Sequence, residues 1–526
     1  MNHNRIALTV LLIGVFLRFH ALGQDTRFHP DESLFTSFAR AAAVEGDWLL
    51  HGPLDKTPLS IYANALSLQF IGVQPLGNGV LDLDPHQGEF AARLPNVLAS
   101  VLLIALMLRL SRDLALIQPG AVPTSASRHY APLFAALLLA FSPFAIAFSA
   151  TAFTDILMLL WAVIGLRLVI RGRWGWSGLF LTLGFASKQQ GLFYLPLLIL
   201  IGWQIHGLSW RRLARLFIPL FIGIALLLAW DIARDQTSIW ALAATNNNPD
   251  RLLVNLTELL PRLSTWLDFG GALLGPGWLT ALLLSIALMT VFWHTRDGKR
   301  DKGVMIDLIL AGYVVSYGLL HWIAAFNTYD RYLLLILPPV SLLVARSLAR
   351  IAAGAALSTI PPRQRLIPPF VLIAVGLIMI PAALDASEGR MNVGGDRGAH
   401  EGIDQLATYL NSKPVATVIY DHWLGWELGY YLGVWTDKRR VYYPTAAALV
   451  HDALLLEEIG PRYLPAPKNR PVTPWIDALS DAGFSIEHDY ETSRFVVYRL
   501  MPPWVEADAA AAGSSSPVLR AASGVE

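Results

Sequence analysis

The apolar segment WGWSGLFLTLGFASKQQGLFYLPLLILIGWQI, residues 174–205, decides how this chain must fold. As one helix it would reach about 48 Å, well beyond a hydrocarbon core of about 30 Å. Basic side chains flank it on both sides: Arg167, Arg171 and Arg173 before it, Arg211, Arg212 and Arg215 after it. Because short loops rich in Lys and Arg stay in the cytoplasm, both ends lie on that side. We therefore predict two short helices of about 23 Å each, broken at ASKQQG (186–191), with Lys188 sunk in the outer leaflet.

The composition of the whole chain is that of a polytopic membrane protein. Of its 526 residues 54% are hydrophobic and 15% are charged, whereas soluble domains carry about 25% charged residues. Nine further apolar segments have the length of a span: 6–22, 94–117, 131–149, 152–170, 213–232, 272–293, 305–326, 331–349 and 366–384. The prediction is about eleven transmembrane helices in the plasma membrane, the inner membrane of a bacterium, with the N-terminus cytoplasmic and the C-terminus outside.

Charge and cysteine content exclude two classes of function. The net charge of +1 leaves no basic face for nucleic acid, so no nucleic-acid partner is expected. The sequence has no cysteine, which excludes disulfides and thiolate metal sites.

The chain is predicted to divide into three parts. Residues 1–385 form the transmembrane domain, whose long outer loop 23–93 carries amphipathic helices over SLFTSFARAAAV (33–44) and LSIYANALSLQFIG (59–72). Residues 386–504 alternate helical and strand patterns, which predicts a small extracytoplasmic α/β domain. The clearest of these patterns are IDQLATYLNSK (403–413), VATVIY (415–420), WLGWELGYYLG (423–433), RVYYP (440–444), TPWIDALSDAGF (473–484) and FVVYRL (495–500). The tail 505–526 has the composition of a disordered segment.

Six segments, in order, resemble the motif set of family 39 membrane glycosyltransferases of the GT-C class, which include the protein O-mannosyltransferases and the transferase that adds aminoarabinose to lipid A. They are HPDESLFTSFARAAAVEGDWLL (29–50), DKTPLSIYANALSLQFIG (55–72), EFAARLPNVLAS (89–100), FTDILMLLWAV (153–163), GLFLTLGFASKQQGLFYLPLLIL (178–200) and YDRYLLLILPPVSLLVA (329–345). The family's Lys-Pro-Pro is Lys-Thr-Pro here, and its Lys-(Gly/Pro) is Lys-Gln-Gln. These departures bear on the specificity for the donor head group.

Three acidic residues, the adjacent pair Asp31 and Glu32 and the distant Asp155, are candidate catalytic groups. From the residues alone, Asp31 and Glu32 after Pro30 either cap an amphipathic helix or serve catalysis. Glycosyl transfer needs a carboxylate that takes the acceptor proton as the oxygen attacks the anomeric carbon. The resemblance makes Asp31 that base and Glu32 a residue that orients or structures the site. Asp155 either caps a span together with Thr154 or, by resemblance, is a second active-site carboxylate.

Three cations on the predicted outer face are candidate phosphate ligands. For each of Lys56, Lys188 and Arg331 the alternative is contact with lipid head groups, and Arg331 has a further alternative in pairing with Asp330. Together they suit a lipid-phosphate leaving group, which develops negative charge as the sugar departs. Arg93 is expected to be structural and to bond loop carbonyls.

The resemblance implies an integral membrane glycosyltransferase that moves a sugar from a polyprenyl-phosphate donor such as an undecaprenyl phosphate sugar. The acceptor is a hydroxyl of a lipid, glycan or protein on the outer face, and the reaction inverts the anomeric centre. No cofactor is required, although Asp55 with other outer-face carboxylates could hold a divalent cation. The alternatives are a polytopic transporter or lipid flippase, which should carry its charges near the membrane midplane, and an inactive structural subunit.

Overall fold

The computed structural model describes residues 3–77, 79–116, 125–247, 251–296, 301–357, 367–391, 394, 398–456 and 460–504. By its internal contacts the chain forms two compact units. The helical unit comprises residues 1–26 and 35–397, and the second unit comprises residues 27–34 and 398–526. The predicted disordered tail 505–526 lies outside the described residues.

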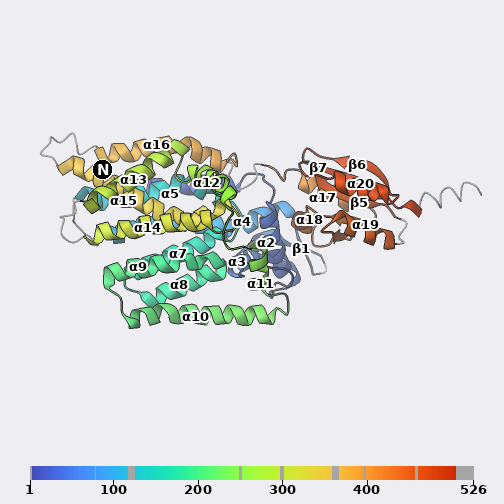
Figure 1. Ribbon diagram of the computed structural model, residues 1–526, viewed down its shortest axis with the longest axis horizontal. Coiled ribbons are helices and arrows are strands. Elements are labelled where there is room, and N and C mark those ends of the chain that lie inside the picture. The colour runs from blue at the N-terminus through green and yellow to red at the C-terminus, as the bar shows by residue number, and fades with distance from the viewer. Residues whose placement is uncertain are drawn as a thin grey trace, which may run out of the picture. The chain divides into compact units, whose positions relative to one another are not determined.

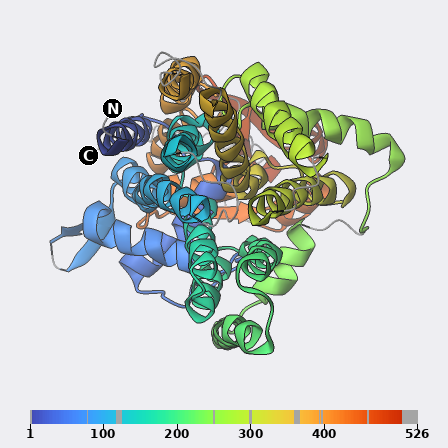
Figure 2. The same ribbon diagram turned by 90° about the vertical axis from the view of Figure 1, so that its left-hand side faces the viewer.

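The helical unit is a bundle of long apolar helices (Figure 1). They are α1 (His3–Leu22), α4 (Pro85–Ala115), α5 (Ser125–Phe141), α6 (Pro143–Ser149), α7 (Asp155–Ile170), α8 (Trp174–Ser187), α9 (Tyr194–His206), α10 (Trp210–Ala233), α13 (Gly277–Arg296), α14 (Lys302–Ile323), α15 (Leu337–Leu357) and α16 (Ile367–Ser387). Helices α7 to α10 pack side by side, as the end-on view in Figure 2 shows. The short 3-10 helix η4 (Asp330–Ile336) leads directly into α15. The apolar span that the two form together is buried in the bundle.

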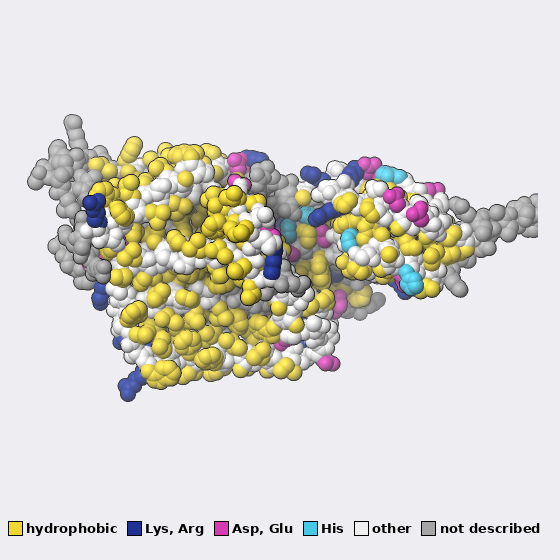
Figure 3. Space-filling model, viewed as in Figure 1, with side chains coloured by type: hydrophobic (Ala, Val, Ile, Leu, Met, Phe, Trp, Pro, Cys, Tyr) yellow, Lys and Arg dark blue, Asp and Glu magenta, His cyan; other side chains and the backbone are white. Residues whose placement is uncertain are grey.

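The surface of this unit suits a lipid environment. Apolar side chains cover the flanks of the helices, and the charged side chains visible in this view lie mainly towards the two ends of the unit (Figure 3). In the described part of the chain, seven helices are long and apolar enough to cross a membrane, or eight if the bent pair α5 and α6 is one span. Helices α7, α8 and α9 are shorter. The count of about eleven spans therefore stays a prediction.

The break in the segment 174–205 is confirmed. Helix α8 ends at Ser187, Lys188 has an extended backbone (φ −159°, ψ 136°), and the 3-10 helix η3 (Gln189–Phe193) leads into α9. Gly191 makes the turn possible, because a Cβ there would lie 2.6 Å from the carbonyl carbon of Gly184. Lys188 thus lies at a break in the helix, and the tight turn after it requires glycine at residue 191.

One predicted span, 131–149, is bent instead of straight. The chain turns by 54° between α5 and α6, at Ser142 and Pro143. Proline at the start of α6 cannot continue the hydrogen bonding of α5. The buried Arg18 stabilises the bend, since its guanidinium donates to the carbonyls of Leu139 and Ala140 at 3.0 Å each.

The two amphipathic segments of loop 23–93 are helical, as predicted. The first is α2 (Pro30–Arg40), extended by the π-helix η1 (Ala41–Glu45), and the second is α3 (Leu59–Ser67), extended by the π-helix η2 (Leu68–Gly72). A hairpin of β1 (Val73–Leu76) and β2 (Val80–Leu83) follows. The sequence patterns did not predict this hairpin or the helices α11 (Ile239–Asn247) and α12 (Leu256–Gly271), which lie between two of the predicted spans.

The second unit is an α/β domain, as predicted for this part of the chain. Its five-stranded sheet has the order β4-β3-β5-β7-β6, with β3 parallel to β4 and β5, and β7 antiparallel to β5 and β6. The strands are β3 (Val418–Asp421), β4 (Arg439–Tyr442), β5 (Arg462–Pro467), β6 (Ser485–Glu491) and β7 (Phe495–Met501), and the helices are α17 (Ile403–Asn411), α18 (Gly425–Tyr431), α19 (Ala446–Leu455) and α20 (Thr473–Asp481). The sequence patterns missed β5, β6 and α19. A buried core that includes Tyr420, Leu449, Leu464 and Trp475 fixes the sheet against its helices.

Candidate functional site

Asp155 and Lys188 form a buried ion pair at the break between α8 and η3. The Lys188 ammonium donates to Asp155 Oδ1 at 2.6 Å, and the two side chains are 2–3% exposed. Asp155 opens α7, where Thr154 occupies the N-cap position but makes no capping hydrogen bond with its side chain. The carboxylate is therefore bound by a cation instead of forming a cap with Thr154.

The residues of the turn before Asp155 are fixed by amide and hydroxyl side chains from α3 and α4. These side chains donate to four successive backbone carbonyls, which a buried turn must otherwise leave unpaired. The bonds run from Asn96 to Thr151 (2.7 Å) and Phe153 (2.5 Å), from Asn64 to Ala152 (3.3 Å), and from Ser60 to Thr154 (3.4 Å). The position of Asp155 is thus set by three polar residues on two other helices.

Lys56 joins the same region through the segment that precedes α3. Its ammonium donates to the neighbouring Asp55 carboxylate at 2.5 Å, and both residues are buried. The segment is tied to the α8 break by two bonds, from Gln189 to the Asp55 carbonyl and from Thr57 to the Phe185 carbonyl, each 2.9 Å. The Lys56 charge consequently acts on Lys188.

Arg331 is the third cation of this cluster, and its charge also acts on Lys188. Its guanidinium lies over the rings of Phe153 and Tyr329, 4.9 and 4.7 Å from their centroids. The Lys188 ammonium lies 5.2 Å from the Tyr332 ring centroid. Asp330 accepts the backbone N–H of Arg331 at 2.7 Å. We call Lys56, Lys188 and Arg331, with Asp55 and Asp155, the cation cluster.

Asp31 and Glu32 belong to the second unit, and they begin α2. The Glu32 carboxylate accepts the N–H of His29 at 3.0 Å, and the Asp31 N–H donates to His29 Nδ1 at 3.1 Å. These reciprocal bonds form a capping box in which histidine replaces the usual serine or threonine. Asp31 thus follows Pro30 inside the helix and is not its N-cap, whereas the buried Glu32 has a structural task.

Arg93 is structural, as expected. Its guanidinium donates to the carbonyl of Thr26 at 2.8 Å and to the Thr26 hydroxyl at 3.1 Å, and only 4% of the residue is exposed. It fixes the chain within the helical unit where the long loop begins.

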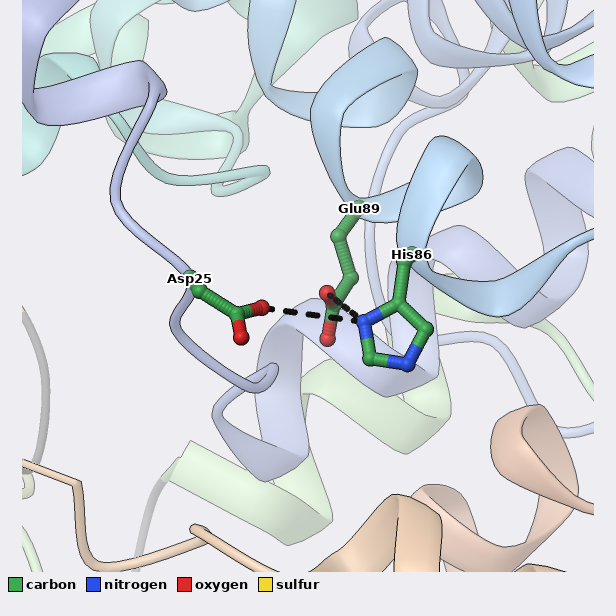
Figure 4. Close-up of side chains that lie close together, drawn as sticks. All are labelled: Asp25, His86 and Glu89. Carbon is green, nitrogen blue, oxygen red and sulfur yellow. Dashed lines mark ion pairs between the residues drawn. The ribbon is translucent and has the colours of Figure 1, made fainter.

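One group among the described residues has ligand atoms close enough to hold a metal ion, and it is not the predicted one. Asp25, His86 and Glu89 bring one ligand atom each within 4.8 Å of one another, and Figure 4 shows both carboxylates facing the same imidazole nitrogen. That nitrogen is 3.7 Å from each carboxylate. The predicted ligand Asp55 instead binds Lys56. A divalent cation at Asp55 stays a prediction.

An apolar pocket of about 850 Å³ opens between α12, α13, α14 and η4. Its lining includes Trp266, Tyr317, His321, Leu333, Ile336 and Val340. The Tyr317 hydroxyl donates to the carbonyl of Tyr332, the residue whose ring faces Lys188. A residue that lines the pocket thus bonds to the residue whose ring faces Lys188.

The sequence did not reveal this pocket, because part of its wall is helix α12, which lies between two predicted spans and was not predicted. Within α12, all of which the structure describes, no residue is buried. Arg262 attaches α12 to the end of α14 by donating to the carbonyls of His321, Ala324 and Phe326 at 2.9–3.1 Å. The amphipathic spacing of residues 256–271 was the signal that could have found it.

A second group that sequence reasoning missed lies in the second unit. His400 Nδ1 is 3.5 Å from the Glu427 carboxylate, and Glu427 is 2% exposed. The pKa of Glu427 is raised to about 7, chiefly by burial; the charges of Asp421 and Asp31 contribute to the increase, and His400 opposes it. No motif marks these two residues, because their neighbours come from distant parts of the chain.

Comparison with known proteins gives the fold. No protein-family model matches the sequence, and no curated protein matches it. Among solved structures, ArnT from Cupriavidus metallidurans in the apo state superimposes with a TM-score of 0.60 at 14% identity, covering 94% of this chain and 97% of that one. The same protein bound to undecaprenyl phosphate gives a TM-score of 0.57 at 15% identity over the same shares of the two chains.

A more distant structure has the same architecture. The Archaeoglobus fulgidus oligosaccharyltransferase tethered with an acceptor peptide gives a TM-score of 0.54 at 11% identity, covering 88% of this chain and 69% of that one. The chain therefore shares the fold of these two proteins, which agrees with the predicted fold class of a helical membrane bundle with a small C-terminal α/β domain.

Proposed function

We propose that this protein is a membrane glycosyltransferase that moves a sugar from a polyprenyl-phosphate carrier to a hydroxyl acceptor on the outer face of the membrane. The observation that carries the proposal is the buried Lys188–Asp155 pair, with Lys56 and Arg331 within electrostatic reach and an apolar pocket beside them. The GT-C fold supports it, since one structure with this fold holds undecaprenyl phosphate.

The cation cluster suits the phosphate of the donor. As the acceptor oxygen bonds to the anomeric carbon, the bond from that carbon to the phosphate oxygen breaks, and the electron pair leaves with the lipid phosphate. Fixed cations in a water-poor site stabilise this developing charge, and they need no reorganisation during the reaction. Attack opposite the leaving phosphate inverts the anomeric centre.

The apolar pocket suits the isoprenoid chain of the same donor. Its lining is mostly aliphatic and aromatic, and burying a methylene group contributes about 0.8 kcal/mol. Tyr317 connects its wall to Tyr332 and so to Lys188. One carrier lipid could thus place its tail in the pocket and its phosphate at the cation cluster.

Asp31 is the proposed base, on the strength of the sequence resemblance. It would take the proton of the acceptor hydroxyl as that oxygen attacks, and it would release the proton before the next cycle. Glu32 would keep the turn in shape through its bond to the His29 N–H. The proposed reaction needs no cofactor. Full activity after dialysis against EDTA would support this and would show that a divalent cation at Asp55 is not required.

Binding and transfer are tested separately. Purified protein in proteoliposomes is first titrated with undecaprenyl phosphate, and wild type should show an increase in melting temperature that K188M loses. Lipid-linked sugars are then offered with lipid, glycan and peptide acceptors, and products are detected by mass spectrometry. D31N should bind the carrier but transfer no sugar.

The control and the contrary results are defined in the same assays. K302M removes an exposed lysine at the start of α14, so it should bind and transfer like wild type. If K188M still bound undecaprenyl phosphate as wild type does, the proposed role of the cation cluster in phosphate binding would be wrong. Movement of a lipid or solute across the vesicle without any covalent product would favour a flippase or transporter.

A further inference from the structure

The segment that carries Asp31 is held by the C-terminal α/β domain. Residues 27–34 count with residues 398–526 as one unit. Arg27 forms an ion pair with Asp404 at 3.5 Å, and the Phe28 N–H donates to the Tyr431 hydroxyl at 2.7 Å. The fully buried Phe28 also packs edge-on against Tyr430, with ring centroids 4.8 Å apart.

One face of α18 makes these contacts. Glu427, Tyr430 and Tyr431 are three and four residues apart, a spacing that places side chains on the same face of a helix. Tyr430 and Tyr431 hold Phe28, so Glu427 faces the same segment. Its charge acts on Asp31 within this unit.

A chain of contacts connects Glu427 to the backbone of Asp31. The Glu427 carboxylate is 3.5 Å from His400 Nδ1, and the His400 ring meets the His29 ring at 5.9 Å between centroids. His29 Nδ1 accepts the N–H of Asp31. This nitrogen must therefore be unprotonated, because a doubly protonated imidazole has no acceptor left.

We propose that Glu427, acting with His400, is a positioning residue for Asp31: it holds the His29–Asp31 turn and supplies a negative charge that makes Asp31 a stronger base. This inference rests on the proposed function. The charged groups that face Glu427 are His400, Asp31 and Asp421, and Asp421 in turn has Arg440 at 3.4 Å from its carboxylate. Asp31 and Asp421 repel the ionised form of Glu427, whereas His400 favours it.

The proposal predicts a rate difference that depends on pH. Below about pH 7 the Glu427 carboxyl is protonated, so glutamine is a close substitute, and E427Q should transfer sugar as fast as wild type at pH 6. Above about pH 7 the wild-type carboxyl becomes negatively charged, whereas the glutamine of E427Q stays neutral. A general base strengthened by such a neighbour reacts roughly 3- to 10-fold faster, so wild type should exceed E427Q by that factor at pH 8.

The matched control is D452N, which removes a carboxylate of the same domain that bonds to Tyr443 and not to the Asp31 segment. D452N should follow the wild-type pH profile, and H400A should follow that of E427Q. Equal profiles for E427Q and wild type would overturn the proposal. An equal loss of the transfer rate in E427Q at every pH would also overturn it, because such a loss indicates damaged folding.

A measurement without turnover separates this inference from the proposed function. Ionisation of buried Glu427 destabilises the fold, so the melting temperature of wild type should fall as pH rises from about 4.5, the ordinary glutamate pKa, to about 7 and level off above, and E427Q should lack this fall. In D31N the fall should move to lower pH, because one repelling charge is gone. A midpoint that D31N does not move would overturn the proposal, whether or not any sugar is transferred.

Discussion

At the scale of single residues, the cation cluster shows why a buried ion pair indicates a site. Lys188 and Asp155 are almost fully enclosed, and removing two charges from water costs more than a surface pair returns. An apolar pair of similar volume would serve stability as well. The charges are therefore best explained by a ligand that needs them, such as a phosphate.

A double-mutant cycle separates stability from ligand binding at this pair. K188M leaves Asp155 buried without its cation, which should destabilise the protein by about 3–5 kcal/mol. D155N in the same chain removes the orphaned charge, so K188M/D155N should recover most of the lost stability. Sugar transfer by K188M and by K188M/D155N should stay at least roughly 100-fold below that of wild type, the loss typical when one hydrogen-bond donor to a developing oxyanion is removed. Thermal melting and transfer assays measure the two effects; recovery of transfer in the double variant would show that the pair is structural.

The role of Glu32 can be separated from that of Asp31. Glu32 accepts a backbone N–H in the capping box, a task that glutamine performs with its carbonyl oxygen. E32Q should keep near wild-type transfer, whereas E32A should lose about 1 kcal/mol of stability together with some activity. Melting curves and initial rates of the two variants check this. If E32Q were as inactive as D31N, Glu32 would act in acid–base chemistry.

At the scale of helices and strands, the sequence was most informative where charge restricted the alternatives. The length of 174–205 and the arginines at both its ends required a break, and the structure has that break at Lys188. The bend at Ser142 was missed although Pro143 marks it, because the apolar run continues through it. Helix α12 was missed because its polar face and its position between spans are also typical of a loop.

The site could be predicted only as far as motifs reach. Lys56, Lys188, Asp155 and Arg331 lie in segments that resemble family motifs, and the structure brings them together. Glu427 and His400 lie in no motif, and their pairing depends on how α18 packs against residues 27–34. Side chains that meet by tertiary packing leave no local spacing for a sequence to reveal.

The close approach at the α8 break yields a prediction for glycine substitutions. A Cβ at residue 191 would lie 2.6 Å from backbone of α8, so G191A must shift the break and with it Lys188. We expect at least a roughly 10-fold loss of transfer, since misplacing a catalytic group by about 1 Å can cost 100-fold. In the described part of the chain a Cβ at Gly312 of α14 meets open space, so G312A should be neutral or slightly stabilising. Equal activity of the two variants would show that the position of Lys188 does not matter.

At the scale of the whole molecule, the distribution of basic residues implies a direction across the membrane. Arginines lie in the turn before α8 and in the first turns of α10, and the positive-inside rule assigns these ends to the cytoplasm. Loop 23–93 and the C-terminal α/β domain then lie outside. This predicted orientation is the reason for proposing a lipid-linked donor, since nucleotide sugars are made in the cytoplasm and would not reach a site outside.

Cysteine labelling tests that orientation without interference, because the chain has no cysteine of its own. Three exposed positions suit single substitutions: Leu76 in the β1–β2 hairpin, Leu208 in the turn between α9 and α10, and Trp435 before β4. In intact cells a membrane-impermeant maleimide should label L76C and W435C, and it should label L208C only after permeabilisation. Each variant should keep wild-type melting behaviour, because none of the three side chains is buried. Labelling of L208C in intact cells would place the arginine-flanked ends of α8 and α10 outside and loop 23–93 in the cytoplasm. A nucleotide sugar could then reach the site directly, and the case for a polyprenyl-phosphate donor would have to rest on the cation cluster and the apolar pocket.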